Sequence, residues 1–308
     1  MAVFTPLTRA QLEVFVQPYG LGPLLDYQPI SEGSENSNFF VSLEQGEFVL
    51  TLIERGQSHE LPFFIELLEH LHHQGFAVPY AVPTMDGQAL RQLAGKPALL
   101  QPRLAGQHVR HAEAVHCRAV GQWLARLHLA TAAQPLQRPS DRGLPWMLEQ
   151  GPRLAERLDP VAAKLLRATL AEIPCLQAAL ATLPQANLHG DLFHDNVLFD
   201  GSRLSGVIDF YNACSGSQLY DLAITVNDWC SQPDGQLDAS RQQALLNAYS
   251  ELRPWCAAEF KQWPRMLRIA CLRFWLSRLL AVDGQPGLSG QPKDPWQYQQ
   301  MLACRWQG

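Results

Sequence analysis

The first third of the chain places apolar residues in short runs separated by polar turns, which is the pattern of β-strands. The runs NFFVSL (38–43) and EFVLTLI (47–53) are joined by EQG, and such a short joint ending in glycine predicts a hairpin. The segment 60–75 then has apolar residues at helical spacing and ends at Gly75, a typical C-cap. Residues 89–106 predict a second pair of strands, with a turn at Gly-Lys-Pro. The expected order is hairpin, helix, hairpin.

The remaining two thirds follow the helical period. Residues 112–131, 160–183 and 241–252 each carry an apolar stripe, and residues 266–282 are apolar nearly all round, which predicts a buried helix. Only two strand-like islands interrupt this region, NVLF (196–199) and LSGVIDF (204–210). Because strands give way to helices near 101–106, we expect an α+β protein divided into residues 1–102 and 103–308.

Composition narrows the function classes. The chain has 308 residues, a net charge of −5 and only 17% charged residues, with no basic block of the kind that binds nucleic acid. No run of about 18 apolar residues predicts a membrane span, and the first residues lack a signal-peptide pattern. Seven cysteines are scattered without CxxC pairs. We therefore expect reduced thiols, a cytoplasmic location, and neither a nucleic acid nor a membrane as partner.

The densest cluster of chemistry is NLHGDLFHDN, residues 187–196. His189, Asp191 and Asn196 have the spacing H-x-D-x-x-x-x-N, and Asp209 follows thirteen residues later at the end of an apolar run. This spacing is typical of the catalytic loop and metal-binding aspartate of kinase-like phosphotransferases. A carboxylate at 191 can accept the proton of an acceptor hydroxyl, while oxygens at 196 and 209 suit Mg²⁺.

Two other interpretations compete with the kinase loop. A zinc site would use His189, Asp191 and His194, but no third His or Cys stands at a useful spacing. A polar turn without function is the other. The combination of the loop, the following strand, Asp209 and the later YDLA at 220–223 is far more specific than any one part.

The string LHGDLFHDNVLF…GVIDF…YDLA resembles the aminoglycoside-phosphotransferase-like kinases, a small-molecule branch of the protein-kinase fold. SEGSENSNFFVS, FVLTLIE, ELPFFIELLEHL and PKDP further resemble the homoserine kinases within this branch. The resemblance implies a two-lobe fold. Residues 1–102 would form the nucleotide-binding lobe, with a small antiparallel sheet and one helix. Residues 103–308 would form the mostly helical catalytic and substrate lobe.

The resemblance also implies a role for individual residues. Asp191 matches the catalytic aspartate, His189 the residue that orients the loop, and Asp221 the residue that supports it. Asn196 and Asp209 match the Mg²⁺ ligands.

The nucleotide site is implied by the same resemblance. The residues expected to contact ATP are Gly33, Ser34 and Asn36 in SEGSENS, Thr51 in the third strand, and Gln101 and Arg103 near the hinge. The cofactors implied are ATP and Mg²⁺.

The third strand departs from the family pattern. Thr51 occupies the position of a lysine that normally pairs the phosphates with a helix glutamate, for which Glu60 and Glu66 are the candidates. Lys96 is the only lysine before residue 164 and is expected in a turn. The chain is therefore either a nucleotide-binding pseudokinase or an active kinase in which the metal and another cation, such as Arg55, balance the phosphate charge. The intact catalytic loop favours the active enzyme.

The sequence identifies the molecule that accepts the phosphate less directly than it identifies the kinase loop. The resemblance implies L-homoserine, phosphorylated on its side-chain hydroxyl in threonine biosynthesis. Choline, a sugar or an aminoglycoside stay open on the residues alone, and so does a metal-dependent hydrolase. Arginines in the apolar segment 266–282 need an anion, either an internal salt-bridge partner or the substrate carboxylate. The candidate substrate contacts are Arg273, Arg278, Tyr211 and Asp228.

Overall fold

The computed structural model describes residues 4–30, 36–54, 58–282 and 294–307. The chain divides into two compact units: Met1–Ala105 with Gly284–Gln291, and Gly106–Asp283 with Pro292–Gly308. We refer to them as the N-terminal and the C-terminal unit and describe each by itself.

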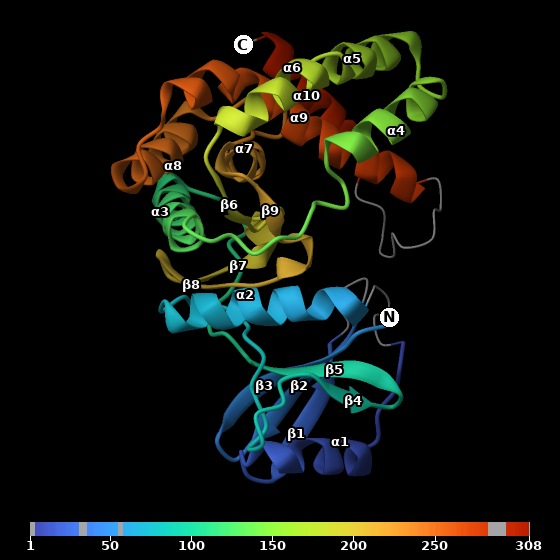
Figure 1. Cartoon of the computed structure of the whole chain (residues 1–308), viewed down its shortest axis with the longest axis vertical. Coiled ribbons are helices and arrows are strands. Elements are labelled where there is room, and N and C mark those ends of the chain that lie inside the picture. Colours follow the sequence, from blue (N-terminus) through green and yellow to red (C-terminus); the bar gives the residue numbers. More distant parts are fainter. Residues whose placement is uncertain (1–3, 31–35, 55–57, 283–293, 308) are drawn as a thin grey trace. The chain divides into compact units, whose positions relative to one another are not determined.

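The N-terminal unit is built on an antiparallel five-stranded sheet with the order β1-β2-β3-β5-β4 (Figure 1). Its strands are β1 (Leu24–Pro29), β2 (Ser37–Leu43), β3 (Gly46–Leu52), β4 (Arg91–Leu93) and β5 (Lys96–Pro102). The helices are α1 (Arg9–Val16) and α2 (Leu61–His73), with short 3-10 turns η1 (Gln17–Tyr19) and η2 (Ser58–Glu60). The hairpin expected around EQG is present as β2 and β3, and the expected helix is α2.

One face of this sheet forms the unit's apolar core. Helix α1 contributes Leu12 and Phe15, which pack in one cluster with Phe39, Val41 and Leu50 of β2 and β3. Full burial of such a side chain contributes about 1.5–3 kcal/mol each. The start of α1 is fixed by a capping box between Thr8 and Gln11. Helix α1 thereby packs against this apolar face of the sheet.

The opposite face carries the polar side chains. In the register of the sheet, Asn38 pairs with Thr51 and Thr51 with Leu99, while Val49 pairs with Gln101. Paired residues of neighbouring strands point to the same side. Two of the residues expected at the nucleotide, Thr51 and Gln101, therefore lie on one face.

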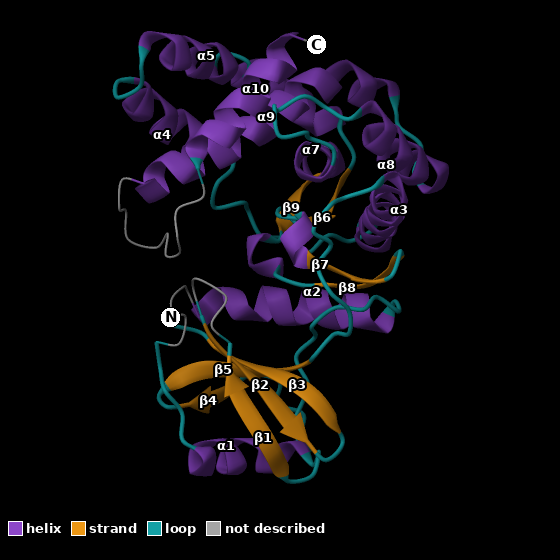
Figure 2. Ribbon diagram, turned by 180° about the vertical axis from the view of Figure 1, so that it is seen from behind, coloured by secondary structure: helices purple, strands orange, loops and turns teal. Residues whose placement is uncertain are grey.

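The C-terminal unit is mainly helical (Figures 1 and 2). Its helices are α3 (Ala114–Thr131), α4 (Leu144–Ala155), α5 (Pro160–Leu170), α6 (Ile173–Ala179), α7 (Gln218–Trp229), α8 (Ala239–Leu252), α9 (Ala257–Val282) and α10 (Pro295–Gln307), with a 3-10 turn η3 (Leu180–Thr182). Helix α3 packs on α8, and α9 packs on both α7 and α10. At the first contact a Cβ on Gly121 would lie 2.3 Å from the Leu245 carbonyl oxygen, so only glycine allows this approach.

Two small antiparallel hairpins are set among these helices. Strand β6 (Gln185–Leu188) pairs with β9 (Cys214–Ser217), and β7 (Val197–Asp200) pairs with β8 (Arg203–Val207). Figure 1 shows α7 viewed down its axis beside β6 and β9, with which it is in contact. The loop 189–196 runs from β6 to β7, so both of its ends are held by strands. None of the helices within the described ranges is long and apolar enough to cross a membrane.

Several elements differ from the sequence prediction. The pattern missed β1, β6 and β9, which are short strands, and the helices α1, α4, α7 and α10. The turn of the second hairpin is Ala94–Gly95, both at positive φ, rather than Gly-Lys-Pro. Lys96 is consequently the first residue of β5 and is not in a turn. The predicted helix over 160–183 is broken between Leu170 and Ile173, where Pro174 allows a new helix to begin but not an old one to continue.

Candidate active site

The loop 189–196 is held by a buried carboxylate. Asp221, in the first turn of α7, accepts a hydrogen bond from the backbone N–H of His189 at 2.7 Å and from that of Gly190 at 2.8 Å. Its Oδ2 also lies 3.3 Å from Nε2 of His128. Burial by itself raises the pKa of Asp221, but hydrogen bonds and positive charge, from His128 above all, outweigh it and hold the pKa below its usual value. The carboxylate is therefore ionised and fixes the loop by its backbone.

The imidazole of His189 holds the backbone of the loop through hydrogen bonds of both its ring nitrogens. Its Nε2 lies 3.0 Å from the carbonyl oxygen of Ile208, which can only accept, so this nitrogen carries the proton. Its Nδ1 then accepts from the backbone N–H of Asp191 at 3.3 Å. Burial lowers the pKa of His189, against the opposing charge of Asp221. A neutral imidazole thus connects the loop to the end of β8 without touching the reacting groups.

Gly190 lets the loop pass close to the segment that follows β8. Its φ is +75°, and a Cβ there would lie 2.5 Å from the carbonyl oxygen of Asn212. Both the left-handed backbone and the close approach require glycine. The backbone at Gly190 is therefore in close contact with the backbone carbonyl of Asn212.

Two residues with oxygen-bearing side chains, Asn196 and Asp209, lie at the open end of the β7–β8 hairpin, opposite its turn. Asn196 donates from Nδ2 to the carbonyl oxygen of Asp191 at 2.8 Å, so its amide oxygen points away from the loop backbone. The backbone N–H of Ile208 donates to the carbonyl oxygen of Asn196 at 2.9 Å, which places Asp209 beside that residue.

Asp209 has φ +63° and ψ +66°, in the left-handed region. A non-glycine residue held there costs about 1–3 kcal/mol and is found mainly at functional sites. One amide oxygen and one carboxylate make a set of protein ligands that suits Mg²⁺, which keeps several waters. Within the described ranges, no group of three His, Cys, Asp or Glu side chains could hold a metal ion.

Thr51 stands where the resemblance to kinases led us to expect a lysine, and its neutral side chain is hydrogen-bonded within the sheet. Thr51 is buried in β3, and its hydroxyl donates to Asn38 Oδ1 at 2.8 Å, with Gln101 Oε1 at 3.4 Å. Thr51 therefore carries no charge and has its own partners on the polar face of the sheet.

Comparison with known proteins agrees with these features. The model of the phosphotransferase enzyme family matches residues 26–255. The chain is 62% identical to the homoserine kinase of Pseudomonas aeruginosa (strain LESB58), over 99% of this chain and 96% of that protein. It is 42% identical to the homoserine kinase of Methylobacillus flagellatus, over 98% of this chain and 94% of that protein. The chain belongs to the phosphotransferase enzyme family.

A solved structure extends the likeness to the whole fold. The amicoumacin kinase hAmiN, solved in complex with AMP-PNP, Ca²⁺ and Ami, matches with a TM-score of 0.69 at 15% identity, over 97% of this chain and 92% of that one. At this identity the match shows that the fold is shared. It confirms the kinase-like fold that the loop motifs predicted, with its antiparallel five-stranded sheet and helical C-terminal part.

The lysine of the N-terminal unit has a different partner from the one expected in this family. Lys96 forms an ion pair with Glu54, two residues beyond β3, and also contacts Thr5. The sequence analysis proposed Glu60 or Glu66 for the helix glutamate, and Glu66 is exposed on α2. No sequence signal indicated Glu54. The proposed substitute Arg55 and the expected phosphate-loop residues Gly33 and Ser34 lie outside the described residues.

The other residues expected at the nucleotide are placed as follows. Asn36 accepts at Oδ1 from the backbone N–H of Glu54 at 3.2 Å, and Gln101 donates to the carbonyl oxygen of Pro79. Arg103 is exposed, and its guanidinium lies 4.0 Å from the centre of the Phe40 ring.

Three of the four arginines of α9, those in the apolar segment 266–282, differ in their partners. Arg268 forms a two-pronged ion pair with Glu172, at 2.6 and 2.7 Å, so the internal salt bridge accounts for it. Arg278 donates to the carbonyl oxygen of Asp294 and to Gln297 near the start of α10. Arg273 is only 5% exposed and donates from Nη2 to Asn212 Oδ1 at 2.8 Å. Within the described part of the chain, Arg273 alone of the three has neither a carboxylate nor a backbone carbonyl as partner.

The remaining substrate candidates lie near the loop. Asp228 of α7 accepts from the backbone N–H of His194 at 2.8 Å and lies 3.0 Å from its Nδ1. Its contacts thus hold the second half of the loop. Tyr211 is in the 3-10 turn η5 (Phe210–Asn212) directly after Asp209.

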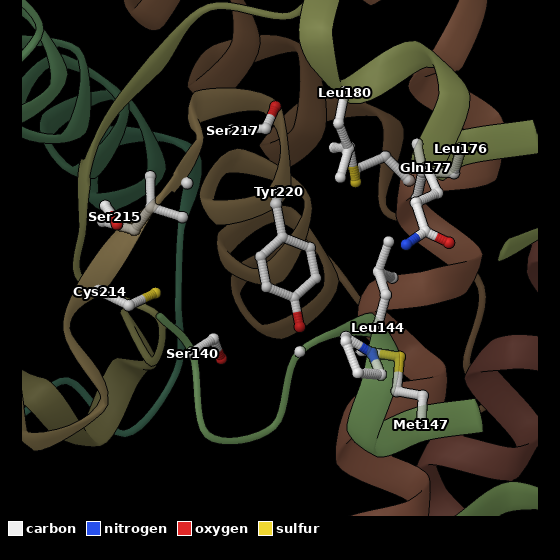
Figure 3. Close-up of a pocket in the computed structure, with 15 residues that line it drawn as sticks. Ser140, Leu144, Met147, Leu176, Gln177, Leu180, Cys214, Ser215, Ser217 and Tyr220 are labelled. Atoms are coloured by element: carbon white, nitrogen blue, oxygen red, sulfur yellow. The ribbon is translucent and has the colours of Figure 1, made fainter. Parts of the chain in front are cut away.

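A cavity of about 210 Å³ lies in the C-terminal unit, lined by residues of β6, β9, α4 and α6 (Figure 3). Leu188 of β6 and Cys214 of β9 form one wall, and Leu144 and Met147 of α4 form another. The ring of Tyr220 stands between them in Figure 3, and its hydroxyl has no hydrogen-bond partner among the described residues. The lining is mostly carbon, so the cavity offers few partners for the charged groups of a ligand.

Proposed function

We propose that the chain transfers the γ-phosphate of ATP to the side-chain hydroxyl of L-homoserine. The observation that carries the choice of acceptor is the 62% identity, over nearly the full length, to a homoserine kinase. The geometry of the loop supports the chemistry, because a phosphoryl transfer requires a positioned hydroxyl and neutralised phosphates more than it requires covalent catalysis.

Asp191 is the proposed base. It accepts the proton of the homoserine hydroxyl as that oxygen attacks phosphorus, while ADP leaves. His189 and Asp221 hold the loop backbone on either side of Gly190 and therefore position Asp191 without touching the substrate. Their contacts are buried, so the loop is already in place before substrate binds.

Asn196 and Asp209 are the proposed ligands of Mg²⁺. The amide oxygen of Asn196 is oriented away from the loop by the hydrogen bond of its NH₂ group to Asp191. When bound, the metal neutralises charge on the phosphates during transfer. The left-handed backbone of Asp209 directs its carboxylate to the same end of the β7–β8 hairpin.

Arg273 is the proposed contact for the carboxylate of homoserine. A buried guanidinium without a protein carboxylate is costly unless a ligand provides the anion. Its Nε and Nη1 donate to no described residue, and they present two donors in a fixed fork that matches a carboxylate. Arg278 is the weaker candidate because Asp294 and Gln297 already accept from its Nη1.

An assay of ADP release tests the proposal directly. L-Homoserine, choline, a sugar and an aminoglycoside are compared as acceptors, with and without Mg²⁺. We expect ADP release that depends on homoserine and on Mg²⁺. Preference for another acceptor would overturn the choice of substrate. Thr51 in the lysine position is the one observation that favours a pseudokinase, which would bind ATP and release no ADP with any acceptor.

Arg273→Met tests the carboxylate contact, with Arg268→Met as its matched control on the same helix. We expect the KM for homoserine to rise at least about tenfold in Arg273→Met, because each charge-assisted bond contributes about 1.5–3 kcal/mol. The KM for ATP should stay nearly constant. Arg268→Met should lower stability, since Glu172 loses its partner, but should leave the homoserine KM unchanged. An unchanged homoserine KM in folded Arg273→Met would remove this residue from the substrate site.

A further inference from the structure

Asp191 and Arg273 are connected through one side chain. Asn212 Nδ2 donates to Asp191 Oδ2 at 3.2 Å, and Asn212 Oδ1 accepts from Arg273 Nη2 at 2.8 Å. The two hydrogen bonds form a chain from the Arg273 guanidinium through the Asn212 amide to the Asp191 carboxylate.

Chemistry fixes the direction of this series. A guanidinium has only N–H donors, so Asn212 must turn its carbonyl oxygen toward Arg273. The NH₂ group of the same amide is then forced toward Asp191. A carboxylate is an acceptor only, so the two requirements agree and no other orientation of the amide satisfies both.

The backbone of Asn212 is fixed as well. The N–H of Ala213 donates to the carbonyl oxygen of Phe210 at 2.8 Å, and the carbonyl oxygen of Ala213 accepts from Arg138 at 2.9 Å. On its other side, the carbonyl oxygen of Asn212 faces Gly190 so closely that no Cβ fits between them. A side chain anchored in this way can hold a neighbour at a constant position.

We propose that Asn212 is a positioning residue for the phosphoryl transfer: it holds the Asp191 carboxylate in one rotamer and links it to the arginine that receives the anion of the acceptor. This inference rests on the proposed function. One oxygen of Asp191 is held by the amide, and the other faces the acceptor hydroxyl. Exchange of the two oxygens by rotation about χ2 is prevented, so the base is oriented before the acceptor arrives.

Charged groups near Asp191 include Arg273 of α9 and the ionised Asp221 of α7, which accepts from the backbone N–H of Gly190. Tyr220, Tyr298 and His189 also lie nearby. Burial raises the pKa of Tyr220 and of Tyr298 and lowers the pKa of His189, so these three side chains are neutral near pH 7.

Two substitutions at 212 separate positioning from simple packing. Asn212→Ala removes the bond to Asp191 and should lower kcat about 10- to 100-fold, with less than about a threefold change in the homoserine KM, because Arg273 keeps its charge. Asn212→Asp has the same shape and can still accept from Arg273, but it places an acceptor against Asp191. If Asn212 only filled space, Asn212→Asp would be the milder change. If it positions Asp191, Asn212→Asp should lose at least as much kcat as Asn212→Ala.

Asn227→Ala is the matched control. Asn227 is buried and also accepts from an arginine, Arg305, at 3.0 Å, while it donates to the carbonyl oxygen of Leu267 at 2.9 Å. We expect it to lower thermal stability and to leave kcat and the homoserine KM unchanged.

Asn212→Asp with kcat within threefold of wild type would overturn the inference. So would equal kcat losses in Asn212→Ala and Asn227→Ala. If Asn212→Ala does not fold, Asn212→Asp decides alone. Failure of wild-type turnover with homoserine would count against the proposed function instead, and the variants would then be compared with the acceptor that does react.

Discussion

The Asp221 carboxylate accepts the backbone N–H of His189 at 2.7 Å, although the two residues are 32 positions apart. The bond joins helix α7 to the catalytic loop at its first residue. A second oxygen of the same carboxylate accepts the N–H of Gly190. The position of the loop therefore depends on one side chain of a helix that lies outside it.

Asp221→Asn should weaken both the loop and the fold. The variant keeps one acceptor oxygen but turns an NH₂ group toward a backbone N–H, which leaves a buried donor unsatisfied at a cost of about 1–3 kcal/mol. We expect a lower thermal midpoint together with a lower kcat. Circular dichroism melting and the ADP-release assay measure the two effects, and a variant with normal melting and normal kcat would contradict this role.

The pH dependence of stability should carry the signature of His189. Its native pKa lies below the ordinary 6.5, so the unfolded chain binds a proton first as pH falls. The stability is fully present above pH 6.5 and is lost as pH decreases toward the native pKa, with a slope of up to about 1.4 kcal/mol per pH unit. Urea unfolding at several pH values should show this slope in the wild type. His189→Gln should lack it, and an identical slope in both proteins would contradict the assignment.

Asp191→Asn should abolish most turnover while leaving the fold and ATP binding nearly intact. The amide has almost the same shape but cannot accept the hydroxyl proton, and loss of a general base lowers rates about 10²- to 10⁴-fold. Steady-state kinetics together with a nucleotide-binding titration test this. Near-normal activity of the folded variant would remove Asp191 from the role of base.

Asp209→Asn should separate metal binding from backbone strain. Asparagine tolerates the left-handed conformation observed at φ +63°, so thermal stability should change little. The loss of a negative ligand should raise the Mg²⁺ concentration needed for half-maximal activity severalfold. A magnesium titration that coincides with that of the wild type would count against Asp209 as a metal ligand.

Thr51→Ala should have a small effect on catalysis. Its hydroxyl is neutral and bonds to Asn38, so we expect a loss of about 0.5–1.5 kcal/mol, close to tenfold in kcat/KM at most. Kinetics with varied ATP measure it. A loss of several orders of magnitude would show that the hydroxyl contributes directly to the transfer.

The sequence by itself determined the chemistry of the loop and the local elements around it. The hairpin of β2 and β3, helix α2 and the spacing of His189, Asp191 and Asn196 depend on residues close in the chain, where turn length and side-chain period decide the structure. The family follows from the same short motifs. Strands β6 (QANL) and β9 (CSGS) were missed because their residues form no apolar run, whereas the equally short β7 was found from the apolar run in NVLF.

Only the tertiary structure decided which polar groups are partners. Arg268, Arg273 and Arg278 look alike in the sequence of α9, yet one pairs with Glu172, one with the start of α10 and one with Asn212. The sequence pattern also gave no indication of the ion pair between Lys96 and Glu54. Each partner comes from a distant segment or the far side of a sheet. Hydrogen-bond geometry is set to within a few tenths of an ångström by the packing of whole elements, which no local pattern encodes.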